Sequence, residues 1–217
     1  LTQIYTLVAM EPPSSMDADA IRSEKVKVLR STRPIDLDDV VFGQYTDGQL
    51  NGTHEPAYRD ESGVPDDSST ETFVALPLHL DNWRWQGVPF LLRTGKRLPE
   101  KRTQIAVHFE CAPVSLFQQP DDGVPCDVSP NVLVITLQPD EGFDLHFEVK
   151  TPGAAFRLET QKLRFRYEEA YGPMPDAYET LLQDIIMGDQ TLFVHSDEVE
   201  ASWQLYTPLL EADLDVQ

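Results

Sequence analysis

The sequence predicts an α+β fold in which helices pack on one face of a large, mostly antiparallel sheet. Three observations support this: helical periodicity at both ends of the 217-residue chain, alternating apolar and polar residues in its middle, and no alternating strand–helix–strand pattern. Such alternation is typical of strands with one covered and one wetter face, which are usually antiparallel. The polar stretch 46–71 could mark a domain boundary. Because the early helices need the sheet to cover them, residues 1–217 are instead expected to form a single domain.

Two helices are expected at the start of the chain. Apolar residues over positions 1–10 recur with helical spacing and no capping residue precedes them, so the chain is expected to begin inside a helix, with further protein upstream. Asp17 is the predicted cap of a second helix through residues 21–30. This helix should end before Pro34, because a residue that precedes proline avoids the helical region.

The middle of the chain is predicted to form strands. A strand at 39–45 precedes a polar stretch, 46–71, which has no periodicity and is predicted to be a long surface loop. Further strands are expected at 72–80, 88–94, 103–109, 131–138, 143–150 and 163–167. Two helices should end the chain, one over 175–188 and one that follows Ser196 as its cap, with a kink or break at Pro208.

The composition excludes several classes of protein. The chain has 17 Lys and Arg against 37 Asp and Glu, and its formal net charge of −20 argues against nonspecific binding to nucleic acid or anionic membranes. No apolar run reaches the roughly 18–20 residues of a membrane span, and no signal peptide is visible. The two cysteines, Cys111 and Cys126, are interpreted as partly buried thiols, so a cytoplasmic location is expected.

Most motifs that carry chemistry are missing. The chain has no GxGxxG, no phosphate-binding P-loop and no nucleophile elbow, so no dinucleotide-binding domain is expected within it. The five histidines are scattered, without HExxH or CxxC companions, and no metal site is expected.

One short stretch, residues 93–102, is strongly basic. It holds five of the 17 basic residues and one acid (Arg93, Lys96, Arg97, Lys101, Arg102 and Glu100). It follows an apolar strand and contains the turn residues Gly95 and Pro99. Lys and Arg on a turn suit a compact phosphate. Alternatively, the stretch offsets acidic surface or guards an exposed edge strand.

Longer stretches resemble a known family. The runs at 24–29 (EKVKVL), 83–98 (WRWQGVPFLLRTGKRL), 151–153 (TPG) and 175–193 (PDAYETLLQDIIMGDQTLF), with the ending 196–210, are similar to the C-terminal domain of glucose-6-phosphate dehydrogenase. The resemblance covers nearly the whole chain. It implies the oxidation of glucose 6-phosphate to 6-phosphogluconolactone with NADP, the first step of the oxidative pentose phosphate pathway. The coenzyme domain and the catalytic histidine would lie upstream of Leu1, so the chain alone should hold no catalytic residue and be inactive.

The resemblance also assigns residues of the substrate site. Lys96 matches a lysine that contacts the substrate. Lys101 stands where many members have an arginine, so it keeps the charge but loses the fork of donors. Gln138 matches a glutamine that reaches the sugar.

Some members of this family hold a second, structural NADP in this domain. Arg93 and Arg102 match basic positions of that site. The other four positions have lost the family's residues (Ala106, Thr136, His146 and Arg164). No structural NADP is therefore expected here.

The resemblance implies a homodimer or homotetramer assembled through the sheet. The alternative is a stand-alone, non-catalytic module for sugar-phosphate binding or assembly. The expected start inside a helix favours the enzyme, and an upstream Rossmann segment in the gene would decide between the two.

Overall fold

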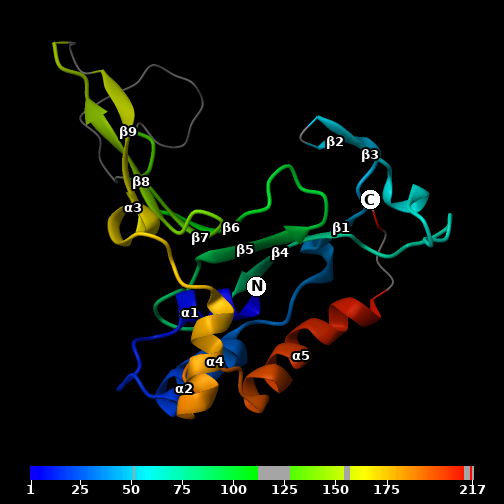
Figure 1. Cartoon of the computed structure of the whole chain (residues 1–217), viewed down its shortest axis with the longest axis horizontal. Coiled ribbons are helices and arrows are strands. Elements are labelled where there is room, and N and C mark those ends of the chain that lie inside the picture. Colours follow the sequence, from blue (N-terminus) through cyan, green and yellow to red (C-terminus); the bar gives the residue numbers. More distant parts are fainter. Residues whose placement is uncertain (51, 112–127, 154–156, 213–215, 217) are drawn as a thin grey trace. The chain divides into compact units, whose positions relative to one another are not determined.

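The computed structural model describes residues 1–50, 52–111, 128–153, 157–212 and 216 (Figure 1). It contains helices and antiparallel strands, which confirms the predicted α+β class. The chain divides into two compact units, Leu1–Pro99 with Ala177–Gln217, and Glu100–Asp176.

Three helices of the first unit surround its core. They are α1 (Thr2–Ala9), α2 (Ala18–Ser31) and α5 (Ser196–Glu211). The Asp17 side chain accepts a hydrogen bond from the backbone of Ala20 at 2.9 Å, which confirms the predicted cap of α2. Such a bond satisfies one of the N–H groups that the first turn of a helix leaves without a partner.

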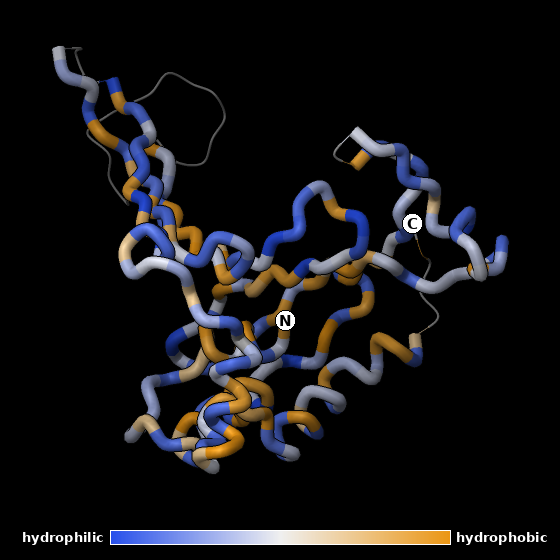
Figure 2. Tube along the Cα trace, viewed as in Figure 1, coloured by the Kyte–Doolittle hydropathy of each residue, from blue (hydrophilic) through white to orange (hydrophobic). Residues whose placement is uncertain are grey.

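The core of this unit lies between these helices and a three-stranded antiparallel sheet. The sheet has the order β1 (Val41–Gly43), β4 (Phe73–His79) and β5 (Pro89–Gly95). Alternate residues of β4 and the residue just after it are buried against apolar side chains of the three helices (Leu76, Leu78 and Leu80 against Tyr5, Ala9, Val28, Leu29, Leu205 and Leu209). Figure 2 shows the hydrophobic positions gathered on these strands and helices.

A buried ion pair also joins the helices. The Lys25 ammonium of α2 lies 2.8 Å from a carboxylate oxygen of Glu198 in α5, and both side chains are less than a tenth exposed. Gln3 of α1 donates a hydrogen bond to Glu198 and accepts one from Lys25. Three helices therefore meet at one closed polar contact.

The prediction of a long surface loop at 46–71 was only partly correct, because the segment also contains regular structure. The segment contains an antiparallel pair, β2 (Gly48–Leu50) and β3 (Thr53–Glu55), and a 3-10 turn, Tyr58–Asp60. These strands have three residues each, too few for an alternating pattern to stand out in a polar sequence. A second 3-10 turn, Leu37–Asp39, occupies the start of the strand predicted at 39–45.

The second unit is built on a four-stranded antiparallel sheet. Its strands, in sheet order, are β6 (Thr103–His108), β7 (Val132–Gln138), β8 (Gly142–Lys150) and β9 (Leu158–Arg166). β9 begins five residues earlier than predicted. It is followed by α3 (Tyr167–Tyr171), which the sequence did not indicate.

The two faces of this sheet differ in chemistry. Cross-strand partners put Ile135, Phe143 and Phe165 on one face, next to Leu145 and Leu163. The opposite face carries charged side chains such as Asp144, Lys162 and Arg166 beside the apolar Val132 and Val134. Figure 2 shows the resulting alternation of hydrophobic and hydrophilic positions along the strands. The predicted alternation is thus confirmed, with one apolar face.

The C-terminal helices differ from the prediction in detail. α4 (Ala177–Met187) occupies the predicted range. The cap of α5 is His195 rather than Ser196, because the His195 ring accepts from the backbone N–H of Asp197. α5 continues through Pro208 without a break. Cys111 is disulfide-bonded, so its interpretation as a thiol was wrong, and Cys126 lies outside the described residues.

Candidate functional site

The basic stretch forms a turn at the end of β5, where the backbone is closely packed. The Lys96 N–H donates a 2.8 Å hydrogen bond to the carbonyl of Thr72, which directly precedes β4. A Cβ at Gly95 would lie 2.8 Å from the ring of Phe73, so only glycine fits there without a shift. Arg97 has a φ of +54°, a left-handed conformation that costs an L-residue roughly 1–2 kcal/mol. The turn is therefore held in one specific path.

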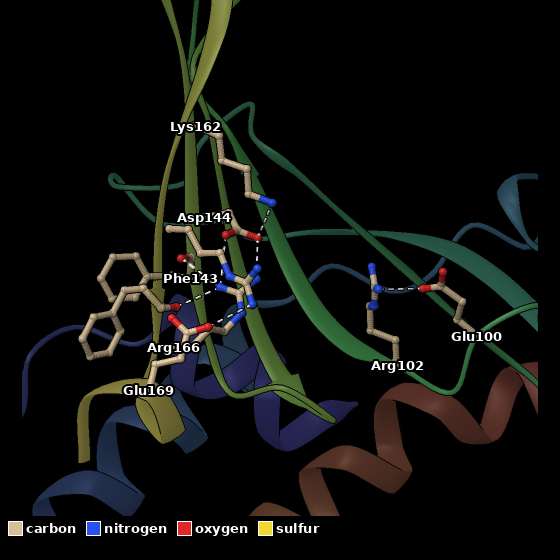
Figure 3. Close-up of polar contacts among 9 residues, drawn as sticks. Glu100, Arg102, Phe143, Asp144, Lys162, Arg166 and Glu169 are labelled. Atoms are coloured by element: carbon tan, nitrogen blue, oxygen red, sulfur yellow. Dashed lines mark hydrogen bonds and ion pairs between the residues drawn. The ribbon is translucent and has the colours of Figure 1, made fainter. Parts of the chain in front are cut away.

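The cationic side chains of this stretch differ in how they are paired. The Arg97 guanidinium contacts Glu55 at 2.7 Å and Glu61 at 3.0 Å. Arg102 pairs with Glu100 at 2.7 Å (Figure 3). Within the described part of the chain, the remaining three cations form no ion pair (Arg93, Lys96 and Lys101). Both predicted substrate lysines are thus among the cations with no carboxylate partner.

The three predicted substrate residues fall in both units. Lys96 belongs to the first unit, and Lys101 and Gln138 belong to the second. Gln138 ends β7 and pairs with Thr103, the first residue of β6, so Lys101 lies two residues from Gln138's cross-strand partner. All three side chains are exposed. The structure therefore brings Lys101 and Gln138 to the same end of one sheet.

The Glu61 carboxylate, which lies beside the turn, is stabilised in its charged form. Tyr45 donates a 2.8 Å hydrogen bond to Glu61 and Arg97 a 3.0 Å bond, and together they hold the pKa of Glu61 below its usual value. The partial burial of Tyr45 and its bond to Glu61 raise the pKa of the tyrosine hydroxyl. This group is therefore ionic at neutral pH, with Glu61 negative and Arg97 positive. No sequence pattern indicated this group, because Tyr45, Glu55 and Glu61 border or lie within the segment predicted as a loop without periodicity.

A second ionic cluster lies on the polar face of the β6–β9 sheet (Figure 3). Asp144 is buried and accepts two hydrogen bonds from Arg166, at 3.0 and 2.8 Å, while Lys162 lies 3.0 Å away. The bonds from Arg166, and then those from Lys162, lower the pKa of Asp144 to about 2. On the same face, Arg164 pairs with Glu169 at 3.3 Å. The cations of this cluster are therefore already matched by carboxylates.

Among the described residues, no group of three His, Cys, Asp or Glu side chains is arranged to hold a metal ion. In the same part of the chain, no helix has the length and apolar character needed to cross a membrane.

Comparison with known proteins gives consistent matches over the whole chain. Residues 1–215 match the family model described as glucose-6-phosphate dehydrogenase, C-terminal domain. Among curated proteins, the chloroplastic glucose-6-phosphate 1-dehydrogenase of Solanum tuberosum is 50% identical over 97% of this chain, and that of Chlamydia trachomatis is 45% identical over 97%. The chain spans only 37% and 48% of these two proteins.

Solved structures give the same result. A glucose-6-phosphate dehydrogenase in complex with its substrate glucose 6-phosphate aligns over 99% of this chain, with 38% identity and a TM-score of 0.84. The glucose-6-phosphate 1-dehydrogenase of Mycobacterium avium aligns over 100% of it, with 33% identity and a TM-score of 0.79. The chain covers 44% and 43% of those two chains.

Proposed function

Because the chain belongs to the family of glucose-6-phosphate dehydrogenase C-terminal domains, we propose that it is the substrate-binding and assembly part of such an enzyme. The whole enzyme oxidises glucose 6-phosphate to 6-phosphogluconolactone and reduces NADP. The chain corresponds to less than half of its curated relatives, so the coenzyme domain and the general base belong to the part of the enzyme outside residues 1–217.

One observation supports the substrate site most directly. In a chain of net charge −20, Lys96 and Lys101 have no carboxylate partner among the described residues, while Arg97 and Arg102 beside them are neutralised. An unpaired ammonium group can contact a phosphate without first giving up an ion pair. Lys96 is therefore assigned to the phosphate group. Lys101 and Gln138, at one end of the β6–β9 sheet, are assigned to substrate binding as the family resemblance implies, with Gln138 able to donate to or accept from a sugar hydroxyl.

The test is an initial-rate assay of the whole enzyme with glucose 6-phosphate varied. Hydrogen bonds to charged groups contribute about 1.5–3 kcal/mol, so Lys96→Ala should raise KM about 10- to 100-fold. Lys101→Ala should raise it in the same direction. Arg33→Ala, which removes an exposed arginine paired with Asp81 elsewhere in the chain, is the control and should leave KM unchanged. An unchanged KM in both lysine variants would refute the assignment.

The chain itself is not proposed to hold NADP. NADP would accept the hydride when bound by the remainder of the enzyme. On the β6–β9 sheet, a nucleotide phosphate would meet the buried carboxylate of Asp144 and cations that already have partners. These residues fit a structural NADP poorly, which agrees with the predicted loss of that site. Tight binding of NADP by residues 1–217 alone would contradict this part of the proposal.

The apolar face of the same sheet supports self-association. Leu163 is 59% exposed and Phe143 42% exposed, both on this face. Apolar surface of this kind is stabilised when a partner covers it. We assign the face to a second copy of the chain, which gives a homodimer or a homotetramer built from such dimers.

A further inference from the structure

Arg97, the neighbour of Lys96, ties the basic turn to the segment before it. Its Nη1 lies 2.7 Å from Glu55 in β3, and its Nη2 lies 3.0 Å from Glu61, which follows the 3-10 turn. Tyr45 donates a 2.8 Å hydrogen bond to the same oxygen of Glu61. One side chain thus connects the turn to two separate points of the segment predicted to be a loop.

The backbone completes a closed ring of contacts. The Thr72 carbonyl accepts the Lys96 N–H at 2.8 Å, and the Thr72 hydroxyl accepts the Tyr45 N–H at 3.1 Å. Starting from Lys96, the ring runs through Arg97, Glu61, Tyr45 and Thr72 and returns to Lys96. Each member is held from two sides, so the path of the turn depends on the Arg97 side chain as well as on the backbone.

The conformation of Arg97 indicates that its side chain is needed there. It is the one non-glycine residue with a positive φ in the part of the chain that the structure describes. A left-handed conformation persists in an L-residue only when its surroundings hold it. Glycine would adopt this backbone freely but could not reach Glu55 or Glu61.

We propose that Arg97 is a positioning residue for Lys96. By pairing with Glu55 and Glu61, Arg97 fixes the conformation of the turn. The Lys96 ammonium group is thereby held in position to contact the phosphate of the substrate. The inference rests on the proposed function, in which Lys96 contacts that phosphate. Arg97 acts through its neighbour and does not touch the substrate, because two carboxylates already occupy its guanidinium group.

A double-mutant cycle in the whole enzyme tests this role, with glucose 6-phosphate varied at saturating NADP. Arg97→Gly removes both ion pairs without adding backbone strain. Exposed ion pairs are individually weak, so we expect KM to rise about three- to tenfold with kcat nearly unchanged. In the Lys96→Ala background, Arg97→Gly should have no further effect on KM, because the group that it positions is gone.

Two further variants sharpen the result. Arg97→Lys keeps the charge but cannot reach two carboxylates with separate nitrogens, so its KM should lie between those of the wild type and Arg97→Gly. Glu61→Gln should raise KM in the same direction as Arg97→Gly. Arg33→Ala, which removes a similarly exposed arginine paired with Asp81, should change neither KM nor kcat.

The outcomes separate this inference from the proposed function. If Lys96→Ala leaves KM unchanged, both fail. If Lys96→Ala raises KM but Arg97→Gly does not, only the positioning role fails. If Arg97→Gly raises KM by the same factor in both backgrounds, Arg97 binds the substrate directly and the inference is overturned. A fall in kcat alone, or an equal effect from Arg33→Ala, would indicate a general structural role and also overturn it.

Discussion

At the scale of single residues, the availability of a charge is decided by its neighbours rather than by the local count of charges. Five cations lie within residues 93–102, but the structure neutralises Arg97 and Arg102. The sequence predicted a cationic stretch and, through the family resemblance, Lys96 and Lys101 within it. It could not show that Arg97 is paired, because its partners Glu55 and Glu61 are about 40 residues away in the chain.

Gly95 should be intolerant of a side chain. We expect Gly95→Ala to lower the free energy of unfolding by about 1–3 kcal/mol, since its Cβ would lie 2.8 Å from the Phe73 ring and 3.3 Å from the Thr72 carbonyl. Gly48→Ala is the control, because no atom lies within 4 Å of a Cβ there. Urea unfolding measures both changes. Equal stability of the two variants would contradict the tight packing of the turn.

Asp144 should make the stability of the second unit depend on pH. Its pKa is about 2 when folded, against an ordinary 3.8, so its contribution is complete above about pH 4 and is lost as the pH falls toward 2. We expect Asp144→Asn to cost about 2 kcal/mol at pH 7, and the gap from the wild type to shrink below pH 4.

Urea unfolding of wild type and Asp144→Asn at pH 7, 4 and 3 measures this gap. Glu159 lies on the same strand as Lys162 and Arg166 and forms an exposed ion pair with Arg157. Glu159→Gln should therefore lower the free energy of unfolding far less than Asp144→Asn does. A gap that stayed constant across this pH range would mean that the ionised carboxylate is not the source of the stability.

At the scale of elements, long periodic segments were predictable and short or capped features were not. The ranges of α1, α2, α4 and most strands follow from apolar spacing. The β2–β3 pair is too short to show a period. The cap of α5 was predicted wrongly because the His195 ring accepts the hydrogen bond from the Asp197 N–H. The residues usually found in this capping position are Ser, Thr, Asp and Asn. The closed ring of contacts through Arg97 joins residues that are far apart in the sequence, so no local pattern predicts it.

Breaking the buried pair of Lys25 and Glu198 should destabilise the packing of α1, α2 and α5. We expect Glu198→Gln to cost about 3–5 kcal/mol, because it leaves the Lys25 charge buried without its counter-ion. The double variant Lys25→Met with Glu198→Leu should recover most of this loss, since it buries no charge.

Urea unfolding of the single and double variants measures the effect. The exposed pair of Lys27 and Glu24 on α2 is the control, and Lys27→Met should cost less than about 1 kcal/mol. If Glu198→Gln lowered the free energy of unfolding no more than Lys27→Met does, the polar contact between the three helices would not contribute to stability as described.

At the scale of the whole molecule, a net charge of −20 argues against polyanionic partners but not against a small phosphate, and the absence of such partners remains a prediction. A polymer meets the whole surface, whereas glucose 6-phosphate would meet one turn. The predicted α+β class is confirmed, while the single domain and the cytoplasmic location remain predictions. The strands within the described residues hydrogen-bond in three separate sheets, which a list of strands in sequence order could not show.

Self-association through the β6–β9 sheet is a prediction for the whole molecule. We expect residues 1–217 to sediment as a dimer at micromolar concentration, and Leu163→Glu to shift them to monomer, because it places a charge on the apolar face. Met16→Glu is the control, because Met16 is 80% exposed and lies outside this sheet. The Met16→Glu variant should remain dimeric. A wild-type monomer would rule out this interface.

The most direct test of the proposed function measures NADP reduction with glucose 6-phosphate as the substrate. The whole enzyme that contains this chain and residues 1–217 alone are assayed side by side. We expect reduction by the whole enzyme and none by the chain alone, which supplies only part of the substrate site. Reduction by residues 1–217 alone, or no reduction by the whole enzyme, would contradict the proposed function.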